Sequence, residues 1–321
     1  MGAPESRRNP PANSERRRTF LQYDVFTGEP LLGNQLAVFT DAAGLEPALM
    51  QRIAREMNFA ESTFILPVEW AGTDIRMRIF TPAVEMPMAG HPTIGSTFAL
   101  ADTGVIKPGT PRFIFHLNAG PTPVDLEWDG GRLSFAWMTQ PNPVFGRVVD
   151  DRAAVAAAVG LTAEDLLSDT PVQEVSCAVP FLYIPLRDAA TVDRAISDAA
   201  AFKRLAKVTG ADLPVFLFAM DGGSSTRHPP TPTVVYSRMF APGLGVTEDP
   251  ATGIASGPLG CYLVKHGLVT PDAARAIVSH QGVAMGRASQ VHISIAVDDG
   301  TISDVKVGGE AVLVARGELL I

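Results

Sequence analysis

Cysteine is scarce in this sequence. Of the 321 residues only Cys177 and Cys261 are cysteines, which is too few for a disulfide framework or for a zinc site with four cysteine ligands. We expect both thiols to be buried structural residues. Because free thiols persist in a reducing compartment, the sequence favours a cytoplasmic location.

Long apolar runs and an excess of positive charge are missing as well. No apolar run reaches the roughly 18 residues of a transmembrane helix, and no signal-peptide core follows the N-terminal arginines. The formal net charge of −8 argues against a surface that binds nucleic acid. The composition is otherwise that of an ordinary globular protein, so we expect neither a membrane nor a nucleic acid as partner.

The sequence also lacks the short motifs of several enzyme classes. It has no G-x-S-x-G nucleophile elbow, no Walker A loop, no H-E-x-x-H zinc motif and no G-x-G-x-x-G nucleotide-binding loop. Its six histidines form no close pair with the spacing of metal ligands. We therefore expect neither a metal nor an organic cofactor.

The first 18 residues are basic and rich in proline and polar side chains. They hold five arginines and two glutamates, a local charge of +3. We interpret residues 1–18 as a disordered lead-in. The remaining length suggests two halves, 19–130 and 131–321, with the C-terminal strand as a candidate to complete the first half.

Short strands alternate with turn residues and occasional helices from Thr19 onwards, a pattern typical of an α+β protein. We expect helices over residues 46–57, 93–102, 150–159, 162–167, 192–208 and 253–266. We expect strands over 20–26, 35–39, 62–66, 75–80, 112–117, 122–128, 133–137, 179–185, 215–220, 234–240, 291–297, 304–307 and 311–315.

One five-residue pattern occurs twice, 160 residues apart. Residues 78–82 and 238–242 both read R-x-F-x-P. Each copy ends an expected strand, and each is followed by a Gly-containing loop (85–90 and 248–253) that opens an expected helix. A chance match is common in a chain of this length, but a match with the same strand–loop–helix context favours an internal duplication.

Both loops have the form of an anion-binding helix start. Backbone N–H groups at a helix N-terminus lack intrahelical partners and lie at the positive end of the helix dipole. Each loop taken singly is more simply a tight turn. As a pair in a duplicated chain, they predict a site for a small carboxylate between the two halves.

Three side chains in or near these loops are candidates for proton transfer. His91 lies at the first helix start, where the dipole favours its neutral form. Asp249 lies in the matching loop, and Glu61 stands in an apolar stretch that would raise its pKa if it were buried. Each also has a structural reading: a hydrogen-bonding His91, a capping Asp249 and a solvent-facing Glu61.

A set of stretches spread from about residue 20 to the end carries a resemblance to a known family. They are Asp24-Val25-Phe26, Gly33-Asn34, Ala37-Val38, 57–64, 80–95, 248–253, Gln281-Gly282, 285–287 and 307–312. In these stretches the chain resembles the PhzF-like family of phenazine biosynthesis proteins, which are relatives of diaminopimelate epimerase. The E-S-T-F, G-H-P and D-x-A-T-G elements, in that order, are the most specific of them.

The resemblance implies two pseudo-symmetric halves, each a curved mixed sheet wrapped around a central helix, with an active site in the cleft between them. It also implies a homodimer and no cofactor. The implied activity is isomerisation, best known for trans-2,3-dihydro-3-hydroxyanthranilate. By this likeness Glu61 carries the proton and His91 and Asp249 assist. The implied substrate-binding residues are Ala60, Gly90, Thr252, Gly253 and Ile254.

Two departures from the related proteins bear on function. The epimerases have a cysteine in each paired loop, whereas this chain has Ala89 and Pro250 at the corresponding places, which argues against racemisation by two thiols. PhzF has small polar residues where this chain has Ala60 and Ile254. The leading hypothesis is a cofactor-independent isomerase acting on a small carboxylate-bearing metabolite. The alternatives are a non-catalytic small-molecule-binding protein and an epimerase that uses one glutamate.

Overall fold

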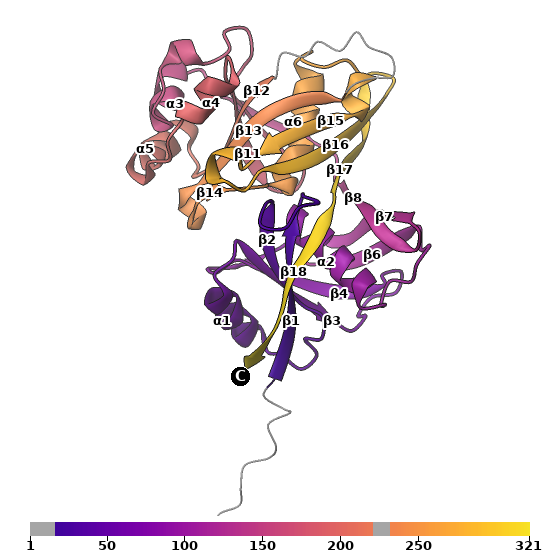
Figure 1. The fold of residues 1–321 in the computed structure, drawn as a ribbon. Coiled ribbons are helices and arrows are strands. Elements are labelled where there is room, and N and C mark those ends of the chain that lie inside the picture. The colour runs from indigo at the N-terminus through magenta and orange to yellow at the C-terminus, as the bar shows by residue number, and fades with distance from the viewer. Residues whose placement is uncertain (1–16, 221–231) are drawn as a thin grey trace, which may run out of the picture.

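Two lobes of similar construction are stacked in the computed structural model, which describes residues 17–220 and 232–321 (Figure 1). The N-terminal lobe is built from β1 (Arg17–Val25), β2 (Asn34–Phe39), β3 (Glu61–Leu66), β4 (Ile75–Phe80), β5 (Glu85–Met86), β6 (Arg112–Leu117), β7 (Gly120–Asp129) and β8 (Arg132–Gln140), with helices α1 (Pro47–Met57) and α2 (Gly90–Asp102).

The C-terminal lobe repeats this order with extra helices on its outer side. Its strands are β9 (Val144–Val148), β10 (Gln173–Ser176), β11 (Pro180–Pro185), β12 (Val215–Met220), β13 (Thr233–Ala241), β14 (Val246–Asp249), β15 (Ile277–Gln281), β16 (Ser289–Asp298) and β17 (Thr301–Gly309). Its helices are α3 (Arg152–Ala158), α4 (Ala189–Arg194), α5 (Ala199–Thr209) and α6 (Gly253–Lys265).

The C-terminal strand β18 (Ala311–Leu320) returns to the N-terminal lobe. It pairs with β1 in antiparallel register, and Figure 1 shows it running down beside β1. The two lobes are joined by the antiparallel pair β8–β17. Arg17 and Arg18, expected in the lead-in, instead belong to β1 because the long β18 offers them Leu320 and Leu319 as partners. The rest of that expected lead-in, 1–16, lies outside the described residues.

The strand pairing of the two lobes is the same, step for step. In the first lobe β1–β2 is antiparallel, β2–β3 parallel, β3–β4 antiparallel and β4–β6 parallel. In the second lobe β10–β11, β11–β12, β12–β13 and β13–β15 follow the same sequence of directions. This repeated topology is the structural form of the duplication that the R-x-F-x-P pattern indicated.

The repeated arginine and phenylalanine have the same contacts in both lobes. Arg78 forms two hydrogen bonds with Glu85 and lies over the ring of Phe80. Arg238 forms two with Glu248 and lies over Phe240. Each bidentate pair joins neighbouring strands, β4 to β5 and β13 to β14. The motif thus fastens the hairpin that precedes each central helix.

Helices α2 and α6 form the centres of the lobes. Each has thirteen residues, of which eleven are buried. Both sequences are apolar or small on every face, which is the pattern of a helix surrounded by other elements. α2 begins at Gly90, three residues before the expected start at residue 93, because the Gly-His-Pro segment already forms its first turn. The expected α+β fold of two halves, each a sheet wrapped around a helix, is confirmed.

Several expected elements were wrong in detail. The helix expected over 192–208 is two helices, because Asp188 and Asp198 each cap a separate start with their carboxylates. The segment 162–167 forms only a short 3₁₀ turn at Ala163–Asp165, where the Asp165 carboxylate accepts the Thr162 N–H. Cys177 and Cys261 are free and buried, as expected.

Candidate active site

The N-termini of α2 and α6 meet at the junction of the lobes. A Cβ atom added to Gly90 would lie 2.6 Å from the Cα of Gly253 and 2.6 Å from the backbone nitrogen of Ile254. Only a glycine at position 90 therefore allows this close approach. As a result, two positive helix ends, with first-turn N–H groups that lack intrahelical partners, lie side by side.

A narrow cavity of ≈ 90 Å³ lies against these two helix starts. Side chains and backbone of both lobes line it, and most of its lining is apolar. All eight residues proposed from the sequence are among the lining residues: Ala60, Glu61, Gly90, His91, Asp249, Thr252, Gly253 and Ile254. Residues 158 positions or more apart in the chain, such as His91 and Asp249, are thus brought to one cavity by the pairing of the lobes.

Glu61 is the first residue of β3, and its side chain is 12% exposed. One carboxyl oxygen lies 3.3 Å from Nδ1 of His91. Burial raises the pKa of Glu61 well above its ordinary value, and the nearby charge of Asp249 raises it further. The solvent-facing reading of Glu61 is wrong, and the carboxyl group has the elevated pKa that suits a group that both takes up and returns a proton.

His91 is the second residue of α2 and is 4% exposed. Burial lowers the pKa of His91 to about 3, and a backbone hydrogen bond to Gln35 acts in the opposite direction. The imidazole is therefore neutral at physiological pH, so its contact with Glu61 is not an ion pair. Its Nε2 atom is buried and has no partner among the described residues, which leaves it for a bound molecule.

Asp249 ends β14 and is held by groups from both lobes. Its Oδ1 accepts a hydrogen bond from Nδ2 of Asn34 at 2.8 Å, and its Oδ2 accepts one from Oγ1 of Thr252 at 2.6 Å. Burial raises the pKa of Asp249 to about 6, although these two hydrogen bonds lower it. Thr252 was expected to bind substrate, but its hydroxyl group is committed to Asp249.

Two buried amides, Asn34 and Gln281, belong to the site although they are not among the eight proposed residues. Asn34 bridges the lobes, because its Nδ2 also lies 2.9 Å from the carbonyl of Ala251 and 3.3 Å from Nδ1 of His91. Gln281 donates to the carbonyl of Asp249 and to the Thr252 hydroxyl, and accepts from the Thr252 N–H. The family-like pairs Gly33-Asn34 and Gln281-Gly282 were the only signals that pointed to them.

Gln140, at the end of β8, donates to the carbonyl of Gly253 at 3.0 Å. No motif in the sequence marked it. Since the carbonyl belongs to the first residue of α6, this hydrogen bond fixes the start of the helix from the strand that joins the lobes.

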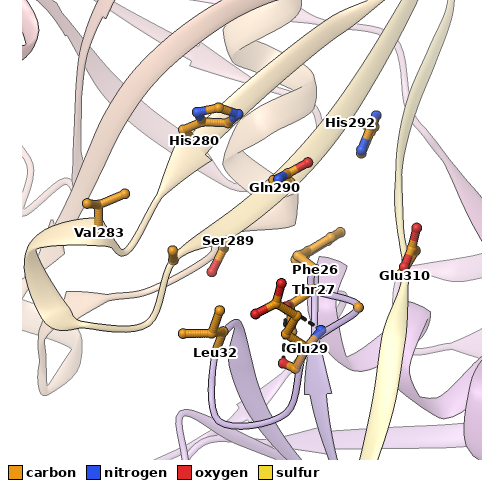
Figure 2. Close-up of a pocket in the computed structure, with 12 residues that line it drawn as sticks. Phe26, Thr27, Glu29, Leu32, His280, Val283, Ser289, Gln290, His292 and Glu310 are labelled. Atoms are coloured by element: carbon orange, nitrogen blue, oxygen red, sulfur yellow. Dashed lines mark hydrogen bonds between the residues drawn. The ribbon is translucent and has the colours of Figure 1, made fainter.

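A second hollow at the junction contains none of the eight proposed residues. Figure 2 shows Phe26, Glu29 and Leu32 from the loop after β1 facing His280, Gln290 and His292 of β15 and β16. Among residues 17–220 and 232–321 no group of three or more His, Cys, Asp or Glu side chains is placed to hold a metal ion. Over the same residues, no helix is both long and apolar enough to cross a membrane.

Residues 23–317 match the family described as phenazine biosynthesis-like protein, PhzC-PhzF. A protein of Mesorhizobium japonicum named as an uncharacterized isomerase is 35% identical, over 95% of this chain and 99% of its own. The trans-2,3-dihydro-3-hydroxyanthranilate isomerase of Pseudomonas aeruginosa is 34% identical, over 93% of this chain and 98% of its own.

The fold is also similar to solved structures of this family. The phenazine biosynthesis protein of the PhzF family from Bacillus anthracis superposes with a TM-score of 0.79 at 26% identity, and the match covers 95% of this chain and 99% of the other. Sequence and fold therefore agree over nearly the whole length of the chain.

Proposed function

This chain belongs to the phenazine biosynthesis-like PhzC-PhzF family, and on that premise we propose that it is an isomerase that moves a proton within a small carboxylate-bearing metabolite, without a cofactor. The observation that carries the proposal is the convergence of Glu61, His91 and Asp249, from both lobes, beside two helix N-termini. Similarity to the hydroxyanthranilate isomerase of Pseudomonas aeruginosa suggests trans-2,3-dihydro-3-hydroxyanthranilate as the first compound to test.

In the proposed reaction the ionised Glu61 removes a proton from a carbon next to an unsaturated bond. The C–H bond breaks, an O–H bond forms on Glu61, and the electron pair enters the unsaturated system. Glu61 then returns the same proton to another carbon of that system. Because the apolar cavity makes the carboxylate more basic than in water, one group can serve in both steps.

The neighbours of Glu61 have supporting roles in this proposal. His91, which is neutral and whose Nε2 has no partner within the part of the chain that the structure describes, orients the substrate by hydrogen bonding. Asp249 and the two helix starts fix the position of the polar groups of the substrate, with its carboxylate at the N–H groups of α2 and α6. General acid–base catalysis of this kind contributes roughly 10²–10⁴-fold in rate.

Replacement of Glu61 tests the proposal. In Glu61→Gln the amide has nearly the same shape but cannot take a proton, so we expect turnover of trans-2,3-dihydro-3-hydroxyanthranilate, or deuterium uptake from ²H₂O into a bound acid, to fall at least 100-fold. Glu56→Gln, on the exposed side of α1, is the matched control and keeps full activity. Unchanged exchange in Glu61→Gln with an intact fold would refute the assignment.

A second candidate is a binding protein without a reaction. Ala60 and Ile254 offer only apolar groups to the cavity, so they can bind a ligand by packing but cannot take part in a reaction. The same deuterium experiment separates the two candidates, because a binding protein protects its ligand and exchanges none of its carbon-bound hydrogens. An epimerase with Glu61 as one base would instead invert a single stereocentre.

A further inference from the structure

A larger pocket of ≈ 580 Å³ adjoins the small cavity at its Asp249 side. The two share Ala60, Val246 and Asp249 as common walls. The outer pocket has a larger share of polar lining than the inner cavity, and its polar residues include Asn34, Arg55, Asn58, Thr247, Glu248 and Arg287. A substrate whose reacting part fills the apolar inner cavity can therefore extend into the outer pocket, where more polar groups are available to bind it.

Most charged groups of the outer pocket already have partners. Glu248 is paired with Arg238 through two hydrogen bonds, and Arg287 is paired with Asp24. Both carboxyl oxygens of Asp249 accept hydrogen bonds from within the protein. These groups are already engaged within the protein, so none of them is the first candidate to pair with a charged group of the substrate in the outer pocket.

Arg55 is the exception. It lies in the last turn of α1 and forms no ion pair among the described residues. Its Nε donates to the carbonyl of Pro82 at 3.3 Å, while Gln51, one turn earlier, donates to the carbonyl of Thr81. These contacts hold the guanidinium at the pocket wall and leave its two terminal nitrogens, which suit a carboxylate, without a described partner.

We propose that the substrate carries a second anionic group, as in an unsaturated dicarboxylate, and that the outer pocket binds this group through Arg55. The first carboxylate lies at the helix starts of the inner cavity and the second lies beside Arg55, with the reacting carbon between them near Glu61. The inference rests on the proposed function only for the position of the reacting carbon. It makes Arg55 a residue that determines specificity.

Equilibrium binding to a matched pair of acids tests this proposal. The probes are trans-3-hexenedioate and trans-3-hexenoate, which share the chain length and double bond and differ in the second carboxylate, together with the longer trans-3-octenedioate. Titration calorimetry on the intact protein is expected to show at least one diacid binding about tenfold more tightly than the monoacid, as for one charge-assisted hydrogen bond.

The variants separate charge from structure. Arg55→Gln keeps an N–H donor for the Pro82 carbonyl but loses the charge, so the preference for the diacid should fall to about one. Arg52→Gln, on the same helix but outside the pocket, keeps the preference. Ala83→Trp, an exposed position in the outer pocket, should weaken the diacid and leave the monoacid unchanged.

The outcomes are distinct from those of the proposed function. Equal affinities for monoacid and diacids in the wild type, no binding of either diacid, or an unchanged preference in Arg55→Gln would overturn the role of Arg55. Deuterium uptake into the monoacid depends on Glu61 and not on Arg55. If the wild type prefers the diacid but shows no deuterium uptake into the monoacid, the isomerase proposal is refuted and the role of Arg55 is not.

Discussion

Glu61, His91 and Asp249 share one cavity, and burial moves all three toward their neutral forms. Burial raises the pKa of the two carboxyl groups and lowers the pKa of the imidazole. Their neighbours then make the pKa values of the two carboxyl groups differ. Asp249 accepts two hydrogen bonds that favour its ionised form, whereas Glu61 faces the charge of Asp249. Glu61 is therefore the last of the two carboxyl groups to ionise.

The rate of proton transfer should rise with pH. Glu61 removes the proton in its ionised form, and its pKa lies well above the ordinary value for glutamate, so activity increases as pH passes through that raised pKa. In Asp249→Asn the charge that raises the pKa of Glu61 is absent, and the rise moves to lower pH. A pH profile of deuterium exchange in both proteins checks this, and identical profiles would contradict it.

Asp249 also makes stability depend on pH. Its pKa rises from 3.8 to about 6 on folding, so the folded state holds the proton more tightly between these values. The contribution is present at low pH and is lost as pH rises through about 6, by about 3 kcal/mol. Urea unfolding at several pH values should show this loss in the wild type and its absence in Asp249→Asn. A constant difference between the two proteins would contradict it.

At the scale of elements, most strands were predictable from their alternation of apolar residues. The two buried helices were predictable from their start and stop residues, such as the Gly-His-Pro start at residue 90 and Gly267 after α6. The short strands β5, β9, β10, β14 and β15 were not predicted, because two to five residues carry too little pattern. The break between α4 and α5 was missed because the cap at Asp198 interrupts an otherwise helical stretch.

The contact of the two helix ends should be intolerant of any side chain. Gly90→Ala places a Cβ against backbone atoms of Gly253 and Ile254, so the lobes must shift at a cost of roughly 1–3 kcal/mol, and activity should fall with stability. Gly28→Ala is the matched control, because its Cβ would meet only the flexible carboxylate of Glu310. Thermal unfolding of both variants decides this, and equal stability would contradict it.

At the scale of the whole molecule, the lobes hold one another by reciprocal contacts. Asn34 of the first lobe reaches Asp249 and the carbonyl of Ala251 in the second. Arg287 of the second lobe reaches Asp24 and the carbonyls of Leu32 and Gly33 in the first. Since Asn34 directly follows Gly33, both sets of contacts help to set the width of the cavity.

Arg287→Met should destabilise the junction strongly. Asp24 is 1% exposed and lies 2.6 Å from the guanidinium, so loss of the cation leaves a buried charge and costs about 3–5 kcal/mol. Asp24→Asn in the same protein should recover part of that loss. Denaturant unfolding measures it, with Arg275→Met, an exposed position on the same lobe, as the control. Equal effects of the two single variants would contradict the role of Arg287.

By itself the sequence determined the family, the duplication and eight of the residues that line the cavity, because short local motifs record backbone geometry and side-chain chemistry. Only the tertiary structure decided how these residues interact. Contacts between residues far apart in the chain bury His91 and Glu61, which makes His91 neutral and raises the pKa of Glu61. Such contacts also give Asn34, Gln281 and Gln140 their hydrogen bonds in the site. The structure likewise shows that the Thr252 hydroxyl donates to Asp249. The same holds for Arg55, whose terminal nitrogens have no partner among residues 17–220 and 232–321, since only the folded chain shows which charges are already paired.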